Sequence, residues 1–121
     1  MNKRQVGSDY EQIAADYLCE NGYSILKRNY RNPFGEIDII ARKEDTVVFC
    51  EIKYRSDDRF GDPFDSVDLR KQRRISKVAL AYTSGWDCPK NVFFRFDVIG
   101  IYGDGRVEQI ENAFPFLSYG R

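Results

Sequence analysis

The chain has 121 residues, no composition shift or Gly/Ser-rich linker, and a formal net charge of zero. This length predicts a single domain over residues 1–121, with a core at about 8–110 and an irregular tail at 111–121. Histidine is absent, which excludes His-based triads and the common zinc sites. Three cysteines without CxxC spacing, no signal peptide and no membrane-length apolar run predict free thiols, no membrane partner and a cytoplasmic location.

The periodicity of the apolar residues predicts helices at 8–21 and 66–83, the first ended by Gly22. Strands are expected at 23–30, 36–43, 46–54, 91–102 and 106–110, and residues 55–64 form a polar loop. The second helix is long enough to connect parallel strands. The predicted fold class is α/β, on the border with α+β. It has a mixed sheet of about five strands flanked by helices, in the order α-β-β-β-α-β-β.

Several predicted positions are structural. One face of the second helix should pack on the sheet through Ile75, Val78, Ala79 and Tyr82. Trp86 and the aromatic run Phe93, Phe94 and Phe96 are expected in the core rather than as a base-stacking platform, although Tyr54 at a strand end could stack on a base. Asp97 with Arg95 should form a polar strand face. Cys50 alternates away from the neighbouring carboxylate face, which argues against a thiol nucleophile.

In the hairpin GEIDIIARKEDTVVFCEIKYR, the charged residues Asp38, Glu51 and Lys53 interrupt the strands. A turn centred on Glu44-Asp45 pairs 43 with 46, 40 with 49 and 38 with 51. Asp38 then lies directly opposite Glu51, and Lys53 points to the same face.

Two carboxylates at that separation repel by roughly 3 kcal/mol at an effective dielectric constant near 20, which a shared proton or divalent cation relieves. Oxygen ligands without histidine favour Mg²⁺ or Mn²⁺, bound with water and substrate phosphate, and Lys53 would orient a water nucleophile. This arrangement suits phosphodiester hydrolysis. The alternative is a solvated face on which Lys53 pairs diagonally with Asp38.

The same residues resemble the PD-(D/E)xK nuclease signature, in which a hairpin presents the Asp, the Glu and the Lys. The wider string NYRNPFGEIDIIA, VVFCEIKYR, KQRR and FRFDVIGI resembles the YraN-like family, whose members are similar to archaeal Holliday-junction resolvases. The resemblance covers about 8–102. It implies a restriction-endonuclease-like fold and metal-dependent DNA cleavage, and Gly35-Glu36 departs from its Pro-Asp pattern.

By this resemblance Asp38 and Glu51 hold the metal, Lys53 serves the attacking water, and Glu11 adds the acid of the first helix. Glu11 has a second interpretation. Ser8-Asp9-Tyr10-Glu11 reads S-x-x-E, a capping box in which Glu11 only caps its own helix. The helical wheel places Glu11 beside the apolar stripe, so both interpretations stand. Glu36 is a candidate secondary acid.

The second helix carries a basic stripe at i, i+3, i+4 and i+7, which would contact a phosphate backbone or form a solvated face: Arg70, Arg73, Arg74 and Lys77. Lys71 and Gln72 lie nearer its core-facing side. In the resemblance this pair approaches the scissile phosphate, and Gln72 joins the catalytic set. Further phosphate-contact candidates are Arg55, Lys27, Arg28 and Arg31.

The sequence therefore predicts an Mg²⁺- or Mn²⁺-dependent endonuclease, a hydrolase that binds DNA, with branched DNA as one candidate substrate and RNA as an alternative. A homodimer is implied only by analogy with resolvases, which cut both strands symmetrically. The competing hypothesis is a nucleic-acid-binding module of the same fold without turnover. A third is a protein-interaction domain whose charges confer solubility.

Overall fold

The computed structural model describes residues 3–55 and 67–117, with the side chains of 3–8 and 55 left out of account. In chain order the elements are α1 (Lys3–Glu20), β1 (Ser24–Asn32), β2 (Gly35–Lys43), β3 (Thr46–Arg55), α2 (Leu69–Thr83), β4 (Phe93–Tyr102) and β5 (Val107–Phe114). This order confirms the predicted fold class. Within the described residues the strands form one mixed sheet in the order β1-β2-β3-β4-β5.

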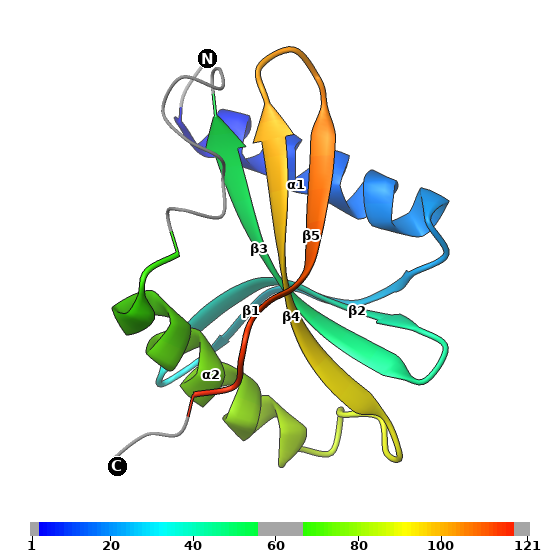
Figure 1. Cartoon of the computed structure of the whole chain (residues 1–121), viewed down its shortest axis with the longest axis vertical. Helices are drawn as coiled ribbons and strands as arrows, with labels where there is room; N and C mark the ends of the chain where they lie inside the picture. Colours follow the sequence, from blue (N-terminus) through cyan, green and yellow to red (C-terminus); the bar gives the residue numbers. More distant parts are fainter. Residues whose placement is uncertain (1–2, 56–66, 118–121) are drawn as a thin grey trace.

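Among the strands that the structure describes, β3 and β4 are parallel, and the other three neighbouring pairs are antiparallel. α2 lies between β3 and β4 in the chain, as expected of a crossover helix. Figure 1 shows the arrows of β3 and β4 pointing the same way, with β5 returning beside β4. The carboxyl end of β3 and the start of α2 therefore belong to one connection.

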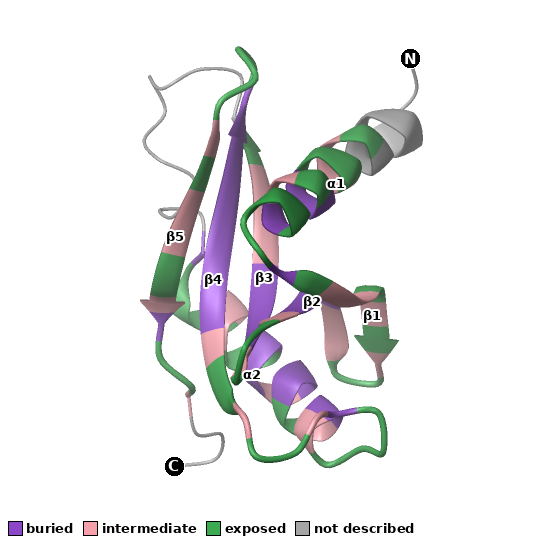
Figure 2. Ribbon diagram, turned by 90° about the vertical axis from the view of Figure 1, so that its right-hand side faces the viewer, coloured by how far each residue is buried: buried purple, intermediate pink, exposed green. Residues whose placement is uncertain are grey.

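The two helices pack on opposite faces of the sheet, because the strands alternate apolar residues between two core clusters. The cluster under α2 contains Ile75, Val78, Ala79 and Tyr82, as predicted, together with Phe49 of β3. The cluster under α1 contains Ala14, Ala15 and Leu18, with Cys50 and Ile99 of the central strands. Figure 2 shows the result: β4 is buried along most of its length, β3 is buried in its first half only, and the edge strand β5 is more exposed.

Both helices start elsewhere than predicted. α1 begins at Lys3, so Ser8 lies within the helix and cannot be its N-cap. α2 begins three residues late, at Leu69, because the Asp68 side chain accepts a hydrogen bond from the backbone N–H of Lys71 and caps the helix there. The end of α1 is as predicted: Gly22 has φ +90°, and the N–H of Tyr23 closes the cap on the Leu18 carbonyl.

The prediction of an irregular tail was wrong for its first residues. β5 continues to Phe114, which pairs with Phe96 of β4 and stacks on its ring at 5.0 Å between centroids. The backbone N–H of Leu117 then donates to Ser76 Oγ of α2. The contact between Phe114 and Phe96 therefore extends the strand beyond residue 110, where the alternating sequence pattern predicted its end.

The aromatic residues around the start of β4 were assigned wrongly to the core. Trp86 is 100% exposed, and Phe93 and Phe94 are 70% and 39% exposed. Trp86 lies in the turn that follows α2, and the buried run of β4 begins only at Phe96.

Asp97 is the reverse case, since it is fully buried rather than on a polar face. Arg95 donates two hydrogen bonds to its carboxylate, and Gln109 Nε2 and the backbone N–H of Asn112 donate one each. These bonds satisfy the carboxylate inside the protein, so the prediction that it is structural rather than chemical is supported.

The cysteine thiols are free: Cys19 is exposed, and Cys50 and Cys88 are buried. Among the helices in the described part of the chain, none has the length and apolar character needed to cross a bilayer. Of the polar loop predicted at 55–64, residue 55 belongs to β3 instead, and 56–64 lie outside the described residues.

Candidate active site

The charged hairpin forms with the predicted register. Lys43 pairs with Thr46 and Ile40 with Phe49, around a turn in which Glu44 has φ +54°. The backbone pairing extends to Ile39 and Cys50. The sequence predicted that Asp38 and Glu51 would form the next pair. They do not, because the paired ladder ends at Ile39 and Cys50.

Asp38 takes over the hydrogen bonding where the ladder ends. Its Oδ2 accepts a 2.8 Å hydrogen bond from the backbone N–H of Ile52, in place of a main-chain carbonyl. The alternation of β2 is interrupted at the same place, since Ile37 and Ile40 both pack on the α2 side while Ile39 packs on the α1 side. This irregularity holds the Asp38 carboxylate at the boundary between the two faces of the sheet.

Glu51 lies next to two lysines. Its Oε1 is 3.4 Å from Lys53 Nζ and 2.5 Å from Lys71 Nζ. The Glu51 and Lys53 side chains are 11% and 17% exposed, and that of Lys71 is 27% exposed. The first turn of α2 thus brings a cation onto the acid of β3, which explains the half-buried position expected for Lys71.

These groups line one cavity of about 330 Å³ between the sheet and the start of α2. Its walls are Gly35, Glu36, Asp38, Glu51, Lys71, Arg74 and Ile75. We call it the catalytic cavity because it contains the acids that the sequence predicts to be catalytic. Asp38 and Glu51, the two acids singled out from the sequence, therefore meet in one space, with Lys53 bound to the second of them. Glu36 also lines the cavity, and its carboxylate is 2.9 Å from Arg31 Nε.

The electrostatics of the cavity are unfavourable to a free carboxylate pair. Burial, followed by repulsion from Glu51, raises the pKa of Asp38 to about 7, although the hydrogen bond from Ile52 opposes the shift. Asp38 therefore holds a proton near neutral pH unless a positive charge approaches it.

The two lysines respond in opposite directions. Burial and the neighbouring Lys71 lower the pKa of Lys53. Burial also acts to lower the pKa of Lys71, but hydrogen bonding to Glu51 and Lys53 outweighs it and the pKa is raised. Lys71 is thus the firmly charged counter-ion of Glu51, and Lys53 is the amine that more readily gives up its proton.

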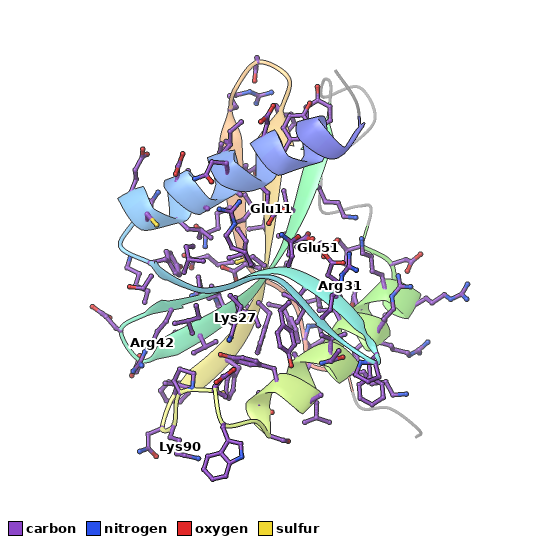
Figure 3. The ribbon with its side chains drawn as sticks, turned by 180° about the vertical axis from the view of Figure 1, so that it is seen from behind. Glu11, Lys27, Arg31, Arg42, Glu51 and Lys90 are labelled. Atoms are coloured by element: carbon purple, nitrogen blue, oxygen red, sulfur yellow. The ribbon has the colours of Figure 1, made fainter. Side chains whose placement is uncertain are left out.

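Glu11 lies across Asp38 from the catalytic cavity. Its Oε1 accepts a 2.6 Å hydrogen bond from Asn29 Nδ2 and lies 3.5 Å from Arg28 Nε. With Asp38 it lines a second cavity, together with Tyr10, Ile52 and Tyr54. Because α1 begins well before Ser8, the capping-box interpretation fails and the side chain faces the sheet. In Figure 3, Glu11 points from α1 towards the region that holds Glu51.

The other predicted residues divide between the cavity and the surface. Arg74 lines the catalytic cavity, whereas Arg70 and Arg73 are exposed on α2. Lys77 Nζ lies 5.0 Å from the centre of the Phe34 ring. Gln72 Nε2 donates to the carbonyl of Val67, so in this structure its amide braces the start of α2.

Arg31 is exposed and paired with Glu36. Of the weaker phosphate candidates, Lys27 pairs with Asp87 and Arg28 lies beside Glu11. The Arg55 side chain lies outside the described residues.

The fit of the catalytic cavity to Mg²⁺ or Mn²⁺ depends on the carboxylates that line it. Across residues 3–55 and 67–117, no group of three or more His, Cys, Asp or Glu side chains is placed to hold a metal ion. Mg²⁺, however, is commonly bound through one or two carboxylates plus water and substrate phosphates. Asp38 and Glu51 supply that set, and the pair already attracts the ammonium group of Lys71. The donor set therefore fits a hard divalent ion that arrives with its substrate.

Two residues near the site, Tyr10 and Asn29, were not assigned to it from the sequence, whereas Tyr54 was expected as a residue that could stack on a base. Tyr10 was expected only on the apolar stripe of α1, yet its ring stacks on Tyr54 beside Asp38. Asn29, at φ +51° in β1, holds Glu11. The left-handed backbone that asparagine tolerates was the one local signal for an irregularity there. The Tyr10–Tyr54 contact joins distant segments, which no periodicity predicts.

The family model and the similar proteins that match this chain indicate the same family. Residues 10–101 match the model described as "Uncharacterised protein family UPF0102". A UPF0102 protein of Thermodesulfovibrio yellowstonii is 46% identical over 94% of this chain and 99% of its own length. One from Syntrophus aciditrophicus is 50% identical over 92% and 88%, and one from Vibrio parahaemolyticus is 41% identical over 93% of each chain. The matched segment contains Asp38, Glu51 and Lys53, and the chain belongs to the UPF0102 family.

Proposed function

We propose that this protein is a metal-dependent endonuclease that hydrolyses phosphodiester bonds in DNA. The observation that carries the proposal is the meeting of Asp38 and Glu51 in one cavity with Lys53 and Lys71 beside them. Burying two carboxylates together is costly, and the cost is visible as the raised pKa of Asp38. A bound cation would offset this cost by neutralising the two carboxylates.

In this proposal Asp38 and Glu51 hold Mg²⁺ or Mn²⁺. The ion would supply Lewis-acid charge against the negative charge that develops on the phosphate during hydrolysis. Asp38 is already fixed by the hydrogen bond from Ile52, and Glu51 extends from the end of β3. Because both come from the central hairpin, the acids have a rigid base from which to orient the scissile phosphate.

The two lysines have separate tasks. Lys53, with its lowered pKa, is the amine suited to orient the attacking water and to take part in its deprotonation. Lys71 keeps its charge and would move from Glu51 to a phosphate oxygen when substrate and metal enter. Glu11 remains a predicted further acid of the site, on the far side of Asp38.

The approach to the cavity is basic. Arg74 lines it, and Arg70 and Arg73 extend the positive charge along the exposed side of α2. Cations arranged on one helix face neutralise successive phosphates of a nucleic-acid strand and release its counterions. This surface supports a polyanionic substrate better than a small neutral one.

The test is a cleavage assay on a panel of end-labelled DNAs: duplex, single-stranded, flapped and four-way branched. Each is incubated with Mg²⁺, with Mn²⁺ and with EDTA. Metal-dependent cleavage of at least one substrate is expected, and Asp38→Asn and Glu51→Gln should abolish it. Glu20→Gln, which removes an exposed carboxylate at the end of α1, is the matched control and should cut like the wild type.

The competing function is a nucleic-acid-binding module without turnover. Lys71 and Lys53 lie beside Glu51 and neutralise its charge, as such a module would require. A wild-type protein that binds the panel, cuts none of it and melts at the same temperature with or without either ion would establish the binding module and remove the nuclease.

A further inference from the structure

Asp38 separates two cavities of different character. The catalytic cavity contains the cations Lys71 and Arg74. The second cavity, of about 260 Å³, is walled by Tyr10, Glu11, Asp38, Ile52 and Tyr54. We call it the aromatic cavity. A ligand with an anionic part and an aromatic part, joined over a short distance, would place one part in each.

The wall of the aromatic cavity is a stacked pair of rings. The Tyr10 and Tyr54 ring centroids are 4.1 Å apart, and the planes are inclined by 11°. Tyr54 remains 40% exposed, so the stack is open to a further ring rather than closed by the core. Planar aromatic side chains at the rim of a nucleic-acid site are the usual platform on which unpaired bases stack.

The charge of the aromatic cavity excludes phosphate as its occupant. Glu11 and Asp38 both line it, and Glu11 is held in place by Asn29 and Arg28. A phosphate group here would face two carboxylates and no lining cation, whereas the catalytic cavity sets Lys71 and Arg74 against its own carboxylates. A nucleobase is uncharged at neutral pH, and its amino groups donate hydrogen bonds to carboxylate oxygens. The catalytic cavity thus suits the phosphate of a nucleotide, and the aromatic cavity suits its base.

We propose that the aromatic cavity binds the nucleobase of an unpaired nucleotide whose phosphate lies in the catalytic cavity. The substrate class is then DNA with at least one unpaired nucleotide at the cleavage position, as in a flap, a bubble or a branch point. A base inside a duplex is stacked on both sides and cannot lie against Tyr54 without leaving the helix. This inference rests on the proposed function and names its substrate.

The alternative role for the two tyrosines is structural, because their stacking also fixes α1 onto β3. The two roles differ in what they predict. A purely structural pair affects stability and is indifferent to the state of the DNA. A base platform discriminates between unpaired and paired DNA in a protein that is still folded.

The experiment measures binding in EDTA, so that it does not depend on cleavage. The probe is a DNA duplex with a short single-stranded flap, in which the flap nucleotide at the junction is 2-aminopurine; the reference is the same strand fully paired. We expect binding to change the probe's fluorescence in the flap and not in the duplex. We also expect the flap to bind about 5- to 150-fold more tightly, the range for stacking of one base on an aromatic side chain.

The variants are Tyr54→Leu, Tyr54→Phe and Phe93→Leu. Tyr54→Leu should abolish both the fluorescence change and the preference, whereas Tyr54→Phe, which keeps the ring, should retain both. Phe93→Leu removes a ring that is 70% exposed outside both cavities, and it should bind as the wild type does. Should Tyr54→Leu not fold, the comparison of flap with duplex in the wild type and Tyr54→Phe still decides.

Equal affinity of the wild type for flap and duplex, or an unchanged preference in folded Tyr54→Leu, would overturn the inference. Its failure is separable from failure of the nuclease. Cleavage of duplex DNA without any Tyr54 effect would remove the base site and leave the nuclease. Flap-selective binding that depends on Tyr54, without cleavage by either metal, would remove the nuclease and leave the base site. A protein that binds no DNA would overturn both.

Discussion

Lys71 Nζ lies 2.5 Å from Glu51 Oε1, so the first turn of α2 is tied to the end of β3 by an ion pair inside the catalytic cavity. The same turn is capped by Asp68, whose side chain accepts from the backbone N–H of Lys71. One residue thus anchors the helix through its backbone and neutralises the central acid through its side chain. Under the proposed function, a metal ion would compete with Lys71 for that acid.

This competition predicts the effect of Lys71→Gln. Without the ammonium group, Glu51 should bind Mg²⁺ or Mn²⁺ several-fold more tightly in the absence of DNA, as measured by calorimetric titration. The metal-free protein should lose about 1 kcal/mol of stability, because a partly buried carboxylate loses its closest partner. Arg70→Gln, one position earlier and exposed, is the control and should change neither quantity. Weaker metal binding by Lys71→Gln would contradict the competition.

The raised pKa of Asp38 predicts how stability depends on pH in EDTA. Burial and Glu51 raise this pKa to about 7 in the folded protein, against about 3.9 in an unfolded chain. Between these values the folded state holds a proton that the unfolded state has released, so stability falls as the pH rises through the window and levels off above it.

The measurement is urea denaturation followed by circular dichroism at about pH 5 and about pH 8. Wild type should lose on the order of 2–4 kcal/mol more between these conditions than Asp38→Asn, which has no proton to release. Added Mg²⁺ or Mn²⁺ should reduce the loss, because the cation stabilises the ionised form. Parallel pH profiles for the two proteins would show that Asp38 titrates normally.

The basic stripe on α2 predicts a salt dependence. If Arg73 and Arg74 each contact a phosphate, the logarithm of duplex affinity should fall with the logarithm of salt concentration by roughly 0.9 per contact. Replacing both with Ala should make the slope shallower by about 1–2, measured by fluorescence anisotropy over a salt series. Lys90→Ala, which removes an exposed cation near Trp86, is the control. An unchanged slope would show that the stripe is a solvated face that does not contact phosphates.

Asp97 predicts a purely structural loss. Its buried carboxylate accepts bonds from Arg95, Gln109 and the backbone of Asn112. Asp97→Asn should reduce the free energy of unfolding by about 3–5 kcal/mol, because Arg95 loses the charge that compensates its own partial burial. Asp87→Asn, at an exposed ion pair with Lys27, should cost less than about 1 kcal/mol. Comparable losses in the two variants would contradict this contrast.

The register of the hairpin was predictable because it depends only on neighbouring residues of the sequence. Two alternating strands about a short turn leave one register that buries Ile40 and Phe49 together, and that register brings Asp38 and Glu51 close. The interruption at Asp38 was not predictable, since it depends on a side chain bonding to Ile52 in place of the ladder.

Contacts between distant segments explain the remaining differences. The helical wheel placed Lys71 near the core but could not supply its partner, because Glu51 reaches it only after α2 crosses the sheet. Aromatic composition likewise gives the number of rings in the chain but does not predict which rings are buried. Phe114 entered the core through its contact with Phe96, while Trp86 and Phe93 did not.

The exposure of Trp86 has a practical consequence for every stability measurement proposed above. It is the chain's single tryptophan, and it is in full contact with water in the native state. Because unfolding moves this indole from water into water, its emission spectrum should shift little across the transition. The dichroism of the peptide backbone and of buried rings such as Tyr82 follows the structure that is lost. In this protein a constant tryptophan spectrum on heating is therefore no sign of an intact fold.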